Sequence, residues 1–145
     1  LFNIIGNNQL SEFGMVVPKF IEAALENKPL IIHGDGTQTR SFTWVGDVVN
    51  YFYLLAEKQI YGEIFNIGQT EEISIKNLAE MIVKETDSKS EIIFKTHKEV
   101  YGEKFEDPMR RTPSIKKIVD ATDYLPTMTI PEMIKEIIDY KKLNS

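Results

Sequence analysis

The spacing of apolar residues divides this chain into short segments that alternate between strand and helix. In residues 15–27, apolar side chains such as Val16, Phe20 and Ala24 recur every three or four positions, which is the spacing of one helix face. The same spacing predicts helices over residues 47–58, 75–85, 113–123 and 131–142. Short apolar runs predict strands over residues 1–5, 29–33, 42–45, 63–67 and 91–96.

Residues that favour helix starts and turns mark the boundaries of these segments. Asp47 and Ser74 are predicted N-caps, and Pro18 suits the first turn of its helix. The polar residues 6–13 and 100–112 show no periodicity and are predicted to be loops. Alternating strands and helices in a chain of 145 residues favour one domain with a layered α/β or mixed α+β architecture.

The composition argues against several classes of function. A net charge of −5 disfavours nucleic acid or an anionic membrane as the main partner. The sequence has no cysteine and only two histidines, which excludes disulfides and argues against a structural zinc site. A chain without thiols fits a reducing compartment, and the predicted location is cytoplasmic. No apolar stretch approaches the ~20 residues that span a bilayer.

The chain opens directly on the apolar run Leu1-Phe2-Asn3-Ile4-Ile5. This run reads as a buried strand without an initiator Met, a signal peptide or a polar lead-in. We therefore expect a segment of a longer protein, and the alternative is a complete small protein.

Arginine is the residue type that points most clearly to a ligand. The chain has 17 basic residues but only three arginines, Arg40, Arg110 and Arg111, and all three lie in predicted loops. A guanidinium can bind two phosphate oxygens at once, so this placement favours a phosphate-bearing ligand. The alternative is that these arginines form ion pairs with Asp35, Asp47, Glu106 or Asp107.

Other residues give weaker indications. The helix that begins near Val16 would direct free backbone N–H groups outward, which suits an anion. Asn3 in a buried strand needs hydrogen-bond partners, either backbone or ligand. His33 ends an apolar strand and is more typical of a packed side chain than of a catalyst. Tyr101 and Phe105 could cover a base or sugar, or anchor their own loop.

The whole sequence lacks both a Gly-x-x-Gly-x-x-Gly motif and a Tyr-x-x-x-Lys pair. It also contains no recognisable P-loop, metal-binding or Ser-His-Asp pattern. Catalysis by these residues alone is therefore not expected.

An ordered set of motifs nevertheless covers nearly the whole chain. It comprises Leu1-Phe2-Asn3, Gly14-Met15-Val16-Val17-Pro18, Gly34-Asp35-Gly36-Thr37-Gln38-Thr39-Arg40, Gly62-Glu63-Ile64-Phe65-Asn66-Ile67-Gly68 and Phe105-Glu106-Asp107-Pro108-Met109-Arg110-Arg111. In this order and spacing the motifs resemble the C-terminal half of extended short-chain dehydrogenases/reductases. These enzymes are NAD-dependent nucleotide-sugar epimerases, dehydratases and decarboxylases, and UDP-glucose 4-epimerase is the expected type.

The resemblance implies a role for each candidate residue. Asn3 and the backbone near Val16 would bind the diphosphate of a UDP-sugar, and residues 31–33, including Ile31 and His33, would lie against the base. Arg40 would hold the diphosphate from one side, and Arg111 together with Arg110 would close the other side.

The resemblance also implies what lies outside this chain. NAD and the catalytic residues would belong to an N-terminal Rossmann domain, so this chain alone is predicted to be inactive. Residues 1–145 would form a single C-terminal substrate-binding domain. Residues 1–5 and about 42–58 would contribute a strand and a strand–helix unit to the Rossmann domain, and the full-length enzyme would be a homodimer. The alternatives are a UDP-glucuronate decarboxylase, a 4,6-dehydratase, or a non-catalytic nucleotide-sugar-binding module.

Overall fold

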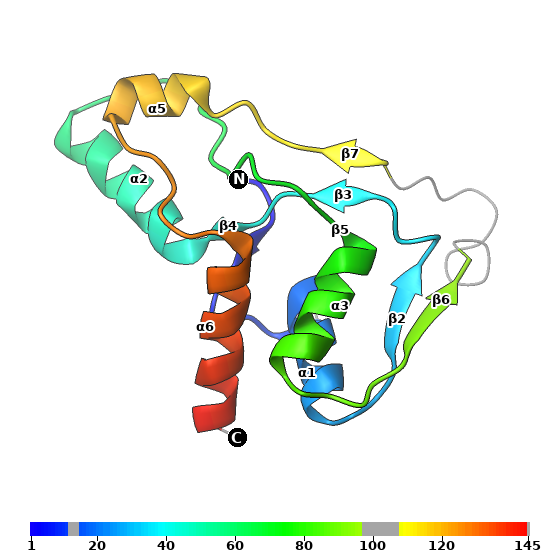
Figure 1. Ribbon diagram of the computed structural model, residues 1–145. Helices are drawn as coiled ribbons and strands as arrows, with labels where there is room; N and C mark the ends of the chain where they lie inside the picture. The colour runs from blue at the N-terminus through cyan, green and yellow to red at the C-terminus, as the bar shows by residue number, and fades with distance from the viewer. Residues whose placement is uncertain (12–14, 97–107, 145) are drawn as a thin grey trace.

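The computed structural model describes residues 1–11, 15–96 and 108–144, which form helices and several short strands (Figure 1). The helices are α1 (Val16–Leu25), α2 (Val45–Glu57), α3 (Ile75–Glu85), α5 (Lys116–Thr122) and α6 (Ile130–Leu143). The strands are β1 (Ile4–Ile5), β2 (Leu30–His33), β3 (Thr39–Arg40), β4 (Thr43–Trp44), β5 (Ile73–Ser74), β6 (Ile92–Lys95) and β7 (Arg110–Arg111). The mixed α/β architecture expected from the sequence is confirmed.

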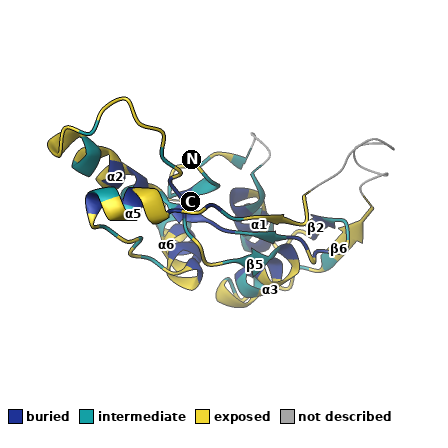
Figure 2. Cartoon of the chain, turned by 90° about the horizontal axis from the view of Figure 1, so that it is seen from above, coloured by how far each residue is buried: buried dark blue, intermediate teal, exposed yellow. Residues whose placement is uncertain are grey.

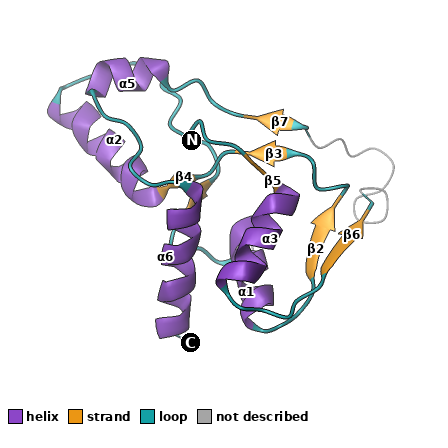
Figure 3. Cartoon of the chain, in the orientation of Figure 1, coloured by secondary structure: helices purple, strands orange, loops and turns teal. Residues whose placement is uncertain are grey.

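The strands form separate small sheets rather than one continuous layer (Figure 3). β1 pairs with β4 and β2 pairs with β6, both in parallel. In the third sheet, β3 lies between β5 and β7, antiparallel to β5 and parallel to β7. This third sheet joins segments from three distant parts of the sequence, and it places Arg40 beside Arg111.

Two clusters of buried apolar side chains hold the described elements together. The larger cluster is formed by α1, α3 and α6 with β2, and its most buried members include Ile21, Ile32, Leu78 and Ile134. The smaller cluster lies mainly between α2 and α5 and includes Tyr51, Ile67 and Ile118. The helices carry buried residues on one side and exposed residues on the other, as their amphipathic spacing predicts (Figure 2).

Several predicted elements are confirmed, with ends that shift by a few residues. Ser74 caps α3 as predicted, because its side-chain oxygen accepts a hydrogen bond from the Asn77 N–H at 3.1 Å. At the start of α6, the Thr129 hydroxyl contacts Glu132 Oε2 at 2.7 Å, and the backbone N–H of Thr129 donates to the same oxygen at 2.8 Å. Both bonds run from Thr129 to Glu132, and they satisfy the backbone N–H and the hydroxyl of the residue at the helix start.

The predicted cap at Asp47 was wrong. Helix α2 begins at Val45, with Trp44 at the N-cap position, so Asp47 lies inside the first turn. Its buried carboxylate instead accepts hydrogen bonds from the Tyr124 hydroxyl at 2.6 Å and from the backbone N–H of Thr127 at 3.1 Å. Asp47 therefore ties the segment between α5 and α6 to α2.

The predicted strand over residues 63–67 is also absent from the described structure. Ile67 accepts one backbone hydrogen bond, from Phe2 at 3.0 Å, while Ile64 is almost fully exposed.

The loop prediction for residues 100–112 was wrong at Arg110 and Arg111, which form β7. Its other notable residues, Tyr101, Phe105, Glu106 and Asp107, lie outside the described residues. In the described part of the chain, no helix is both long and apolar enough to cross a membrane.

Candidate binding site

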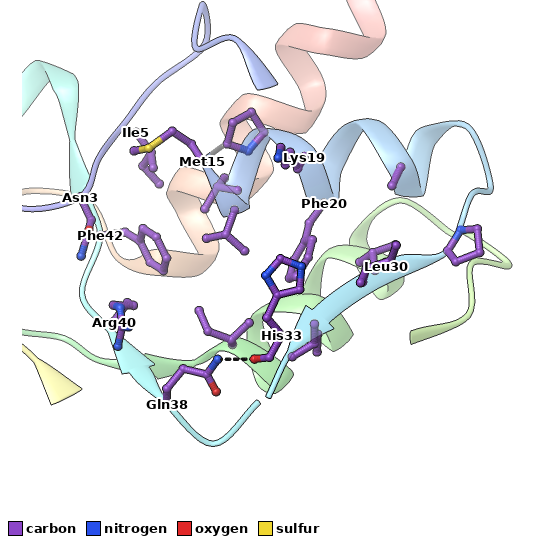
Figure 4. Close-up of a pocket in the computed structure, with 18 residues that line it drawn as sticks. Asn3, Ile5, Met15, Lys19, Phe20, Leu30, His33, Gln38, Arg40 and Phe42 are labelled. Atoms are coloured by element: carbon purple, nitrogen blue, oxygen red, sulfur yellow. Dashed lines mark hydrogen bonds between the residues drawn. The ribbon is translucent and has the colours of Figure 1, made fainter. Parts of the chain in front are cut away.

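A cavity of about 540 Å³ lies between the start of α1, strand β2 and the segment that carries Arg40 (Figure 4). It is lined by Asn3, Ile5, Met15, Val16, Val17, Pro18, Lys19, Phe20, Ala23, Pro29, Leu30, Ile31, Ile32, His33, Gln38, Arg40, Phe42 and Ile75. Five of the residues predicted to bind substrate, Asn3, Val16, Ile31, His33 and Arg40, are therefore brought together here. The volume is in the range of pockets that hold small organic ligands.

The charge of the cavity differs in sign from that of the whole chain. None of the described residues that line it is acidic, whereas Lys19 and Arg40 are basic. This is unexpected for a chain with net charge −5 if charges were placed at random. The lining therefore favours an anionic ligand.

Asn3 lies at one wall of the cavity with both ends of its amide engaged. Its Nδ2 donates to the Ser41 carbonyl at 2.8 Å, and its Oδ1 accepts from Arg111 Nη2 at 2.8 Å. Since Nδ2 carries two hydrogens, one N–H remains to donate to a ligand. The backbone of Asn3 has a φ of 38°, in the left-handed region that Asn adopts more readily than most residues.

Strand alternation places the arginines on two different faces. Neighbouring residues of a strand point to opposite sides, while paired residues of adjacent strands share a side. Arg40 pairs with Arg111, and Arg111 contacts Asn3 at the cavity wall. Thr39 pairs with Arg110, and both contact Glu72, at 3.0 Å and 2.7 Å respectively. Arg111 is thus directed toward the cavity wall, whereas Arg110 is engaged on the other face.

The Arg40 guanidinium is held in place by backbone oxygens. Its Nη1 donates to the Thr39 carbonyl at 2.7 Å and to the Pro108 carbonyl at 2.8 Å. These contacts fix the side chain between β3 and the residues that lead into β7. A guanidinium carries five N–H donors, so it can contact several acceptors at once.

Strand β2 supplies the opposite wall of the cavity. Its pairing with β6 uses the backbone of alternate residues, since the N–H groups of Leu30 and Gly34 donate to Glu91 and Lys95. The backbone groups of Ile31 and His33 consequently point to the other edge, away from β6, which is the inner side of β2 in Figure 1. An extended edge of this kind suits a flat ring that carries its own donors and acceptors.

The start of α1 adds a third anion-binding element. Met15, at the N-cap position, provides no side-chain hydrogen bond, and the first turn contains no acidic residue. Met15, Val16 and Val17 line the cavity, so the start of α1 lies at its wall. The positive end of the helix dipole and the backbone N–H groups of the first turn both favour a negative ligand.

Comparisons with known proteins identify relatives of this chain. Residues 1–68 match the profile described as "NAD dependent epimerase/dehydratase family". Over 140 residues, 96% of the chain, the sequence is 35% identical to a UDP-N-acetyl-alpha-D-glucosaminuronate decarboxylase of Bacillus cytotoxicus.

The chain belongs to the NAD-dependent epimerase/dehydratase family. Within the family, the dTDP-D-glucose 4,6-dehydratase of Homo sapiens is 42% identical over 93 residues, which is 62% of this chain and 26% of the human protein. The crystal structure of a UDP-glucuronic acid 4-epimerase from Bacillus cereus, in complex with UDP-glucuronic acid and NAD, matches 99% of the chain with a TM-score of 0.84 and 32% identity. The chain spans 44% of that epimerase and 44% of the Bacillus cytotoxicus decarboxylase.

Two contributions of this family member to the cavity could not be found by inspecting the sequence. Gln38 is buried, and its Nε2 donates to the His33 carbonyl at 2.8 Å, so it joins β3 to the end of β2. Lys19 lies in the first turn of α1, between the apolar residues Val17 and Phe20. Its position next to the predicted anion-binding helix start could have indicated its place at the cavity.

The residues of this chain do not fit the family cofactor. A dinucleotide is cradled by a glycine-rich turn between a strand and a helix, and the sequence contains no Gly-x-x-Gly-x-x-Gly motif. Among the described residues there is also no group of three or more acidic or histidine side chains that could hold a metal ion. The described lining of the cavity, with Lys19 and Arg40, suits the binding of an anion.

Proposed function

We propose that this chain forms the nucleotide-sugar-binding part of an NAD-dependent epimerase/dehydratase-family enzyme, and that its cavity binds a UDP-sugar. The observation that carries the proposal is a cavity whose described lining residues include no acidic side chain, walled by Asn3, Arg40 and the start of α1. Such a lining matches a diphosphate, which carries its charge on several oxygens that accept hydrogen bonds.

In this proposal the diphosphate lies between the two anchored arginines and the helix start. Arg40 and Arg111 supply charge from adjacent strands, and the remaining N–H of Asn3 donates between them. The N–H groups at the start of α1 bind from the facing side. Lys19 adds a positive charge at the cavity lining.

The base would lie along the inner edge of β2. The backbone N–H and carbonyl groups of Ile31 and His33 are directed to that edge, and the half-exposed Ile31 side chain offers an apolar surface. A pyrimidine ring carries donors and acceptors on its edge and has an apolar face. Its edge would bond the backbone groups of β2, and its face would lie against the Ile31 side chain.

This binding mode gives the chain a defined part in catalysis. The diphosphate is remote from the reacting sugar, and binding energy from remote groups can hold a substrate in the geometry that the reaction needs. NAD and the catalytic acid–base groups would be supplied by a Rossmann domain of the full-length protein.

The surface of α2 supports such a neighbouring domain. Val45, Val49 and Phe52 lie on one side of α2 and are 41%, 58% and 53% exposed. The adjacent pair β1–β4 is a parallel sheet of only two strands, and parallel sheets are normally covered on both faces and extended by further strands. We propose that both features are completed by the Rossmann domain.

The reaction could be epimerisation at the sugar or loss of its carboxylate. The predicted type is an epimerase, and the similarity to the UDP-glucuronic acid 4-epimerase of Bacillus cereus favours it. The alternative is a decarboxylase, favoured by the 35% identity to the decarboxylase of Bacillus cytotoxicus. Both relatives are named for a uronic acid sugar, so we propose a UDP-hexuronic acid as substrate.

Two experiments on the full-length protein test this proposal. In the first, UDP is titrated by calorimetry into the natural protein, into Arg40→Ala and into Lys116→Ala. Loss of a charged hydrogen bond should raise the Kd of Arg40→Ala at least about tenfold. Lys116→Ala removes the same charge from an exposed ion pair on α5 and should leave the Kd unchanged. Equal UDP binding by all three proteins would refute the assignment.

In the second experiment, the protein is incubated with NAD and UDP-glucuronic acid, and the products are separated by chromatography. Release of carbon dioxide identifies a decarboxylase, whereas a UDP-sugar of unchanged mass and new retention time identifies an epimerase. Tight UDP binding without turnover would instead indicate a binding module.

A further inference from the structure

The face of the third sheet that points away from the cavity is organised around one carboxylate. Glu72, which directly precedes β5, accepts hydrogen bonds from Arg110 Nε at 2.7 Å, from the Thr39 hydroxyl at 3.0 Å and from the Thr112 hydroxyl. Its side chain is only 19% exposed, although that of Arg110 is 75% exposed. The bonds from Thr112 and Arg110 hold the pKa of Glu72 below its ordinary value, so it is charged at neutral pH.

These contacts matter because β7 could pair with β3 in more than one way. A strand that slips by one residue turns every side chain to the opposite face. In β7 the two residues are both arginine, so a slip would bring Arg110 to the face now occupied by Arg111. The strand has only two residues, and the residue types alone do not distinguish the two registers.

Glu72 distinguishes them through the residues on either side of Arg111. Arg110 and Thr112 are two positions apart, so they share a face, and both donate to Glu72 Oε1. After a slip by one residue, Met109 and Arg111 would face Glu72. Methionine offers no donor, so one of the two contacts with β7 would be lost.

We propose that Glu72 is a positioning residue that fixes the register of β7, so that Arg111 rather than Arg110 faces the cavity. This role rests on the proposed binding of a diphosphate by Arg111. Glu72 itself does not touch the ligand. It acts through the opposite face of the sheet, and it explains why two adjacent arginines have different environments.

The first test is UDP titration of the full-length protein and four variants. Glu72→Ala should raise the Kd for UDP roughly tenfold, because Arg111 is no longer held at the cavity wall. The double variant Arg110→Ala/Thr112→Val removes both β7 donors while leaving Glu72 in place, and it should reproduce this loss. Glu72→Gln keeps an acceptor of the same shape and should stay within about threefold of the natural Kd.

Glu71→Ala is the matched control, because it removes the neighbouring carboxylate. Glu71 accepts a hydrogen bond from the Ile130 N–H at 3.2 Å, at the start of α6, and has no described contact with β3 or β7. This variant should alter the thermal stability but not the Kd for UDP. If Glu72→Ala binds UDP as the natural protein does and only melts earlier, Glu72 has no positioning role, although the proposed function stands.

A second measurement reads the strand pairing without any ligand. The Thr39 N–H donates to the Met109 carbonyl at 2.8 Å, which makes its hydrogen exchange a direct report on the β3–β7 pairing. Protection of this amide should fall at least about tenfold in Glu72→Ala and remain in Glu71→Ala. If the natural protein fails to bind UDP, the proposed function is wrong. If Glu72→Ala leaves both the protection of Thr39 and the Kd for UDP unchanged, the register role is wrong.

Discussion

The substitution Asn3→Asp gives the sharpest separation between a ligand site and a structural amide. The change preserves size and shape, and Asp tolerates the positive φ of this position much as Asn does. It keeps the oxygen that accepts from Arg111 at 2.8 Å. It replaces the Nδ2 group, which donates to the Ser41 carbonyl at 2.8 Å, with a second oxygen.

The expected effects on folding and on binding differ in size. For folding, the lost bond to Ser41 costs about 1 kcal/mol, and the new charge next to Arg111 returns between zero and about 1 kcal/mol. For binding, losing a charged hydrogen bond costs about 1.5–3 kcal/mol. Repulsion between the new carboxylate and a diphosphate at about 4 Å adds at least about 1 kcal/mol. The Kd for UDP should therefore rise roughly one-hundredfold or more.

The assay pairs UDP calorimetry with urea unfolding of the full-length protein. Asn3→Ala, which removes the donor without adding charge, should fall between the natural protein and Asn3→Asp. Asn50→Asp serves as the control, because it makes the same chemical change on an exposed part of α2. If Asn3→Asp and the natural protein bind UDP with the same Kd, the reasoning fails, and Asn3 is only a link between Arg111 and Ser41.

Three further predictions concern stability. Tyr124→Phe removes the 2.6 Å hydrogen bond to the buried Asp47 and should lower the free energy of unfolding in urea by about 1.5–3 kcal/mol. Hydrogen bonds from Thr112 and Arg110 lower the pKa of Glu72 below its ordinary value of 4.5. The stability that Glu72 contributes to the fold is therefore complete above pH 4.5 and is lost as the pH falls through the lowered pKa. Thermal melts of Glu72→Gln between about pH 3 and 5 should show a weaker pH dependence than the natural protein. Leu78→Ala, in the larger core cluster, should cost about 2–5 kcal/mol in the same urea assay, and a loss well below this would show that the site collapses around the cavity.

The sequence predicted well those elements whose stability comes from their own periodicity. Helix α3 combines an apolar face with the cap at Ser74, so its start was predicted to the residue. The apolar run over residues 29–33 likewise predicted β2, which the structure places at Leu30–His33. In these cases local preference and tertiary packing agree.

The parts that failed depend on partners far away in the chain. Strands β3 and β7 have two residues each, too few for any alternation, and they exist because each pairs with the other across about 70 positions. Asp47 looks like an N-cap, but its carboxylate is used by Tyr124, which no local pattern could indicate. The predicted strand at 63–67 has the right residue types but gains only one backbone bond, from Phe2.

For the candidate site, the sequence supplied the residues through a family resemblance, and the structure brought five of them to one cavity. It could not choose between Arg110 and Arg111, because the choice depends on the face that each residue takes in β7. That face is visible only once the contacts with Glu72 and Asn3 are known.

The division of the interior into two clusters has a consequence for how the chain melts. The buried apolar residues that line the cavity, such as Val17, Leu30 and Phe42, all belong to the larger cluster. A ligand there stabilises only states in which that cluster is formed, by an amount that grows with its concentration relative to Kd. The α2–α5 cluster contributes no residue to the described cavity lining, so its opening does not by itself remove a wall of the cavity. Adding UDP should therefore raise the melting temperature of the larger cluster more than that of the α2–α5 cluster.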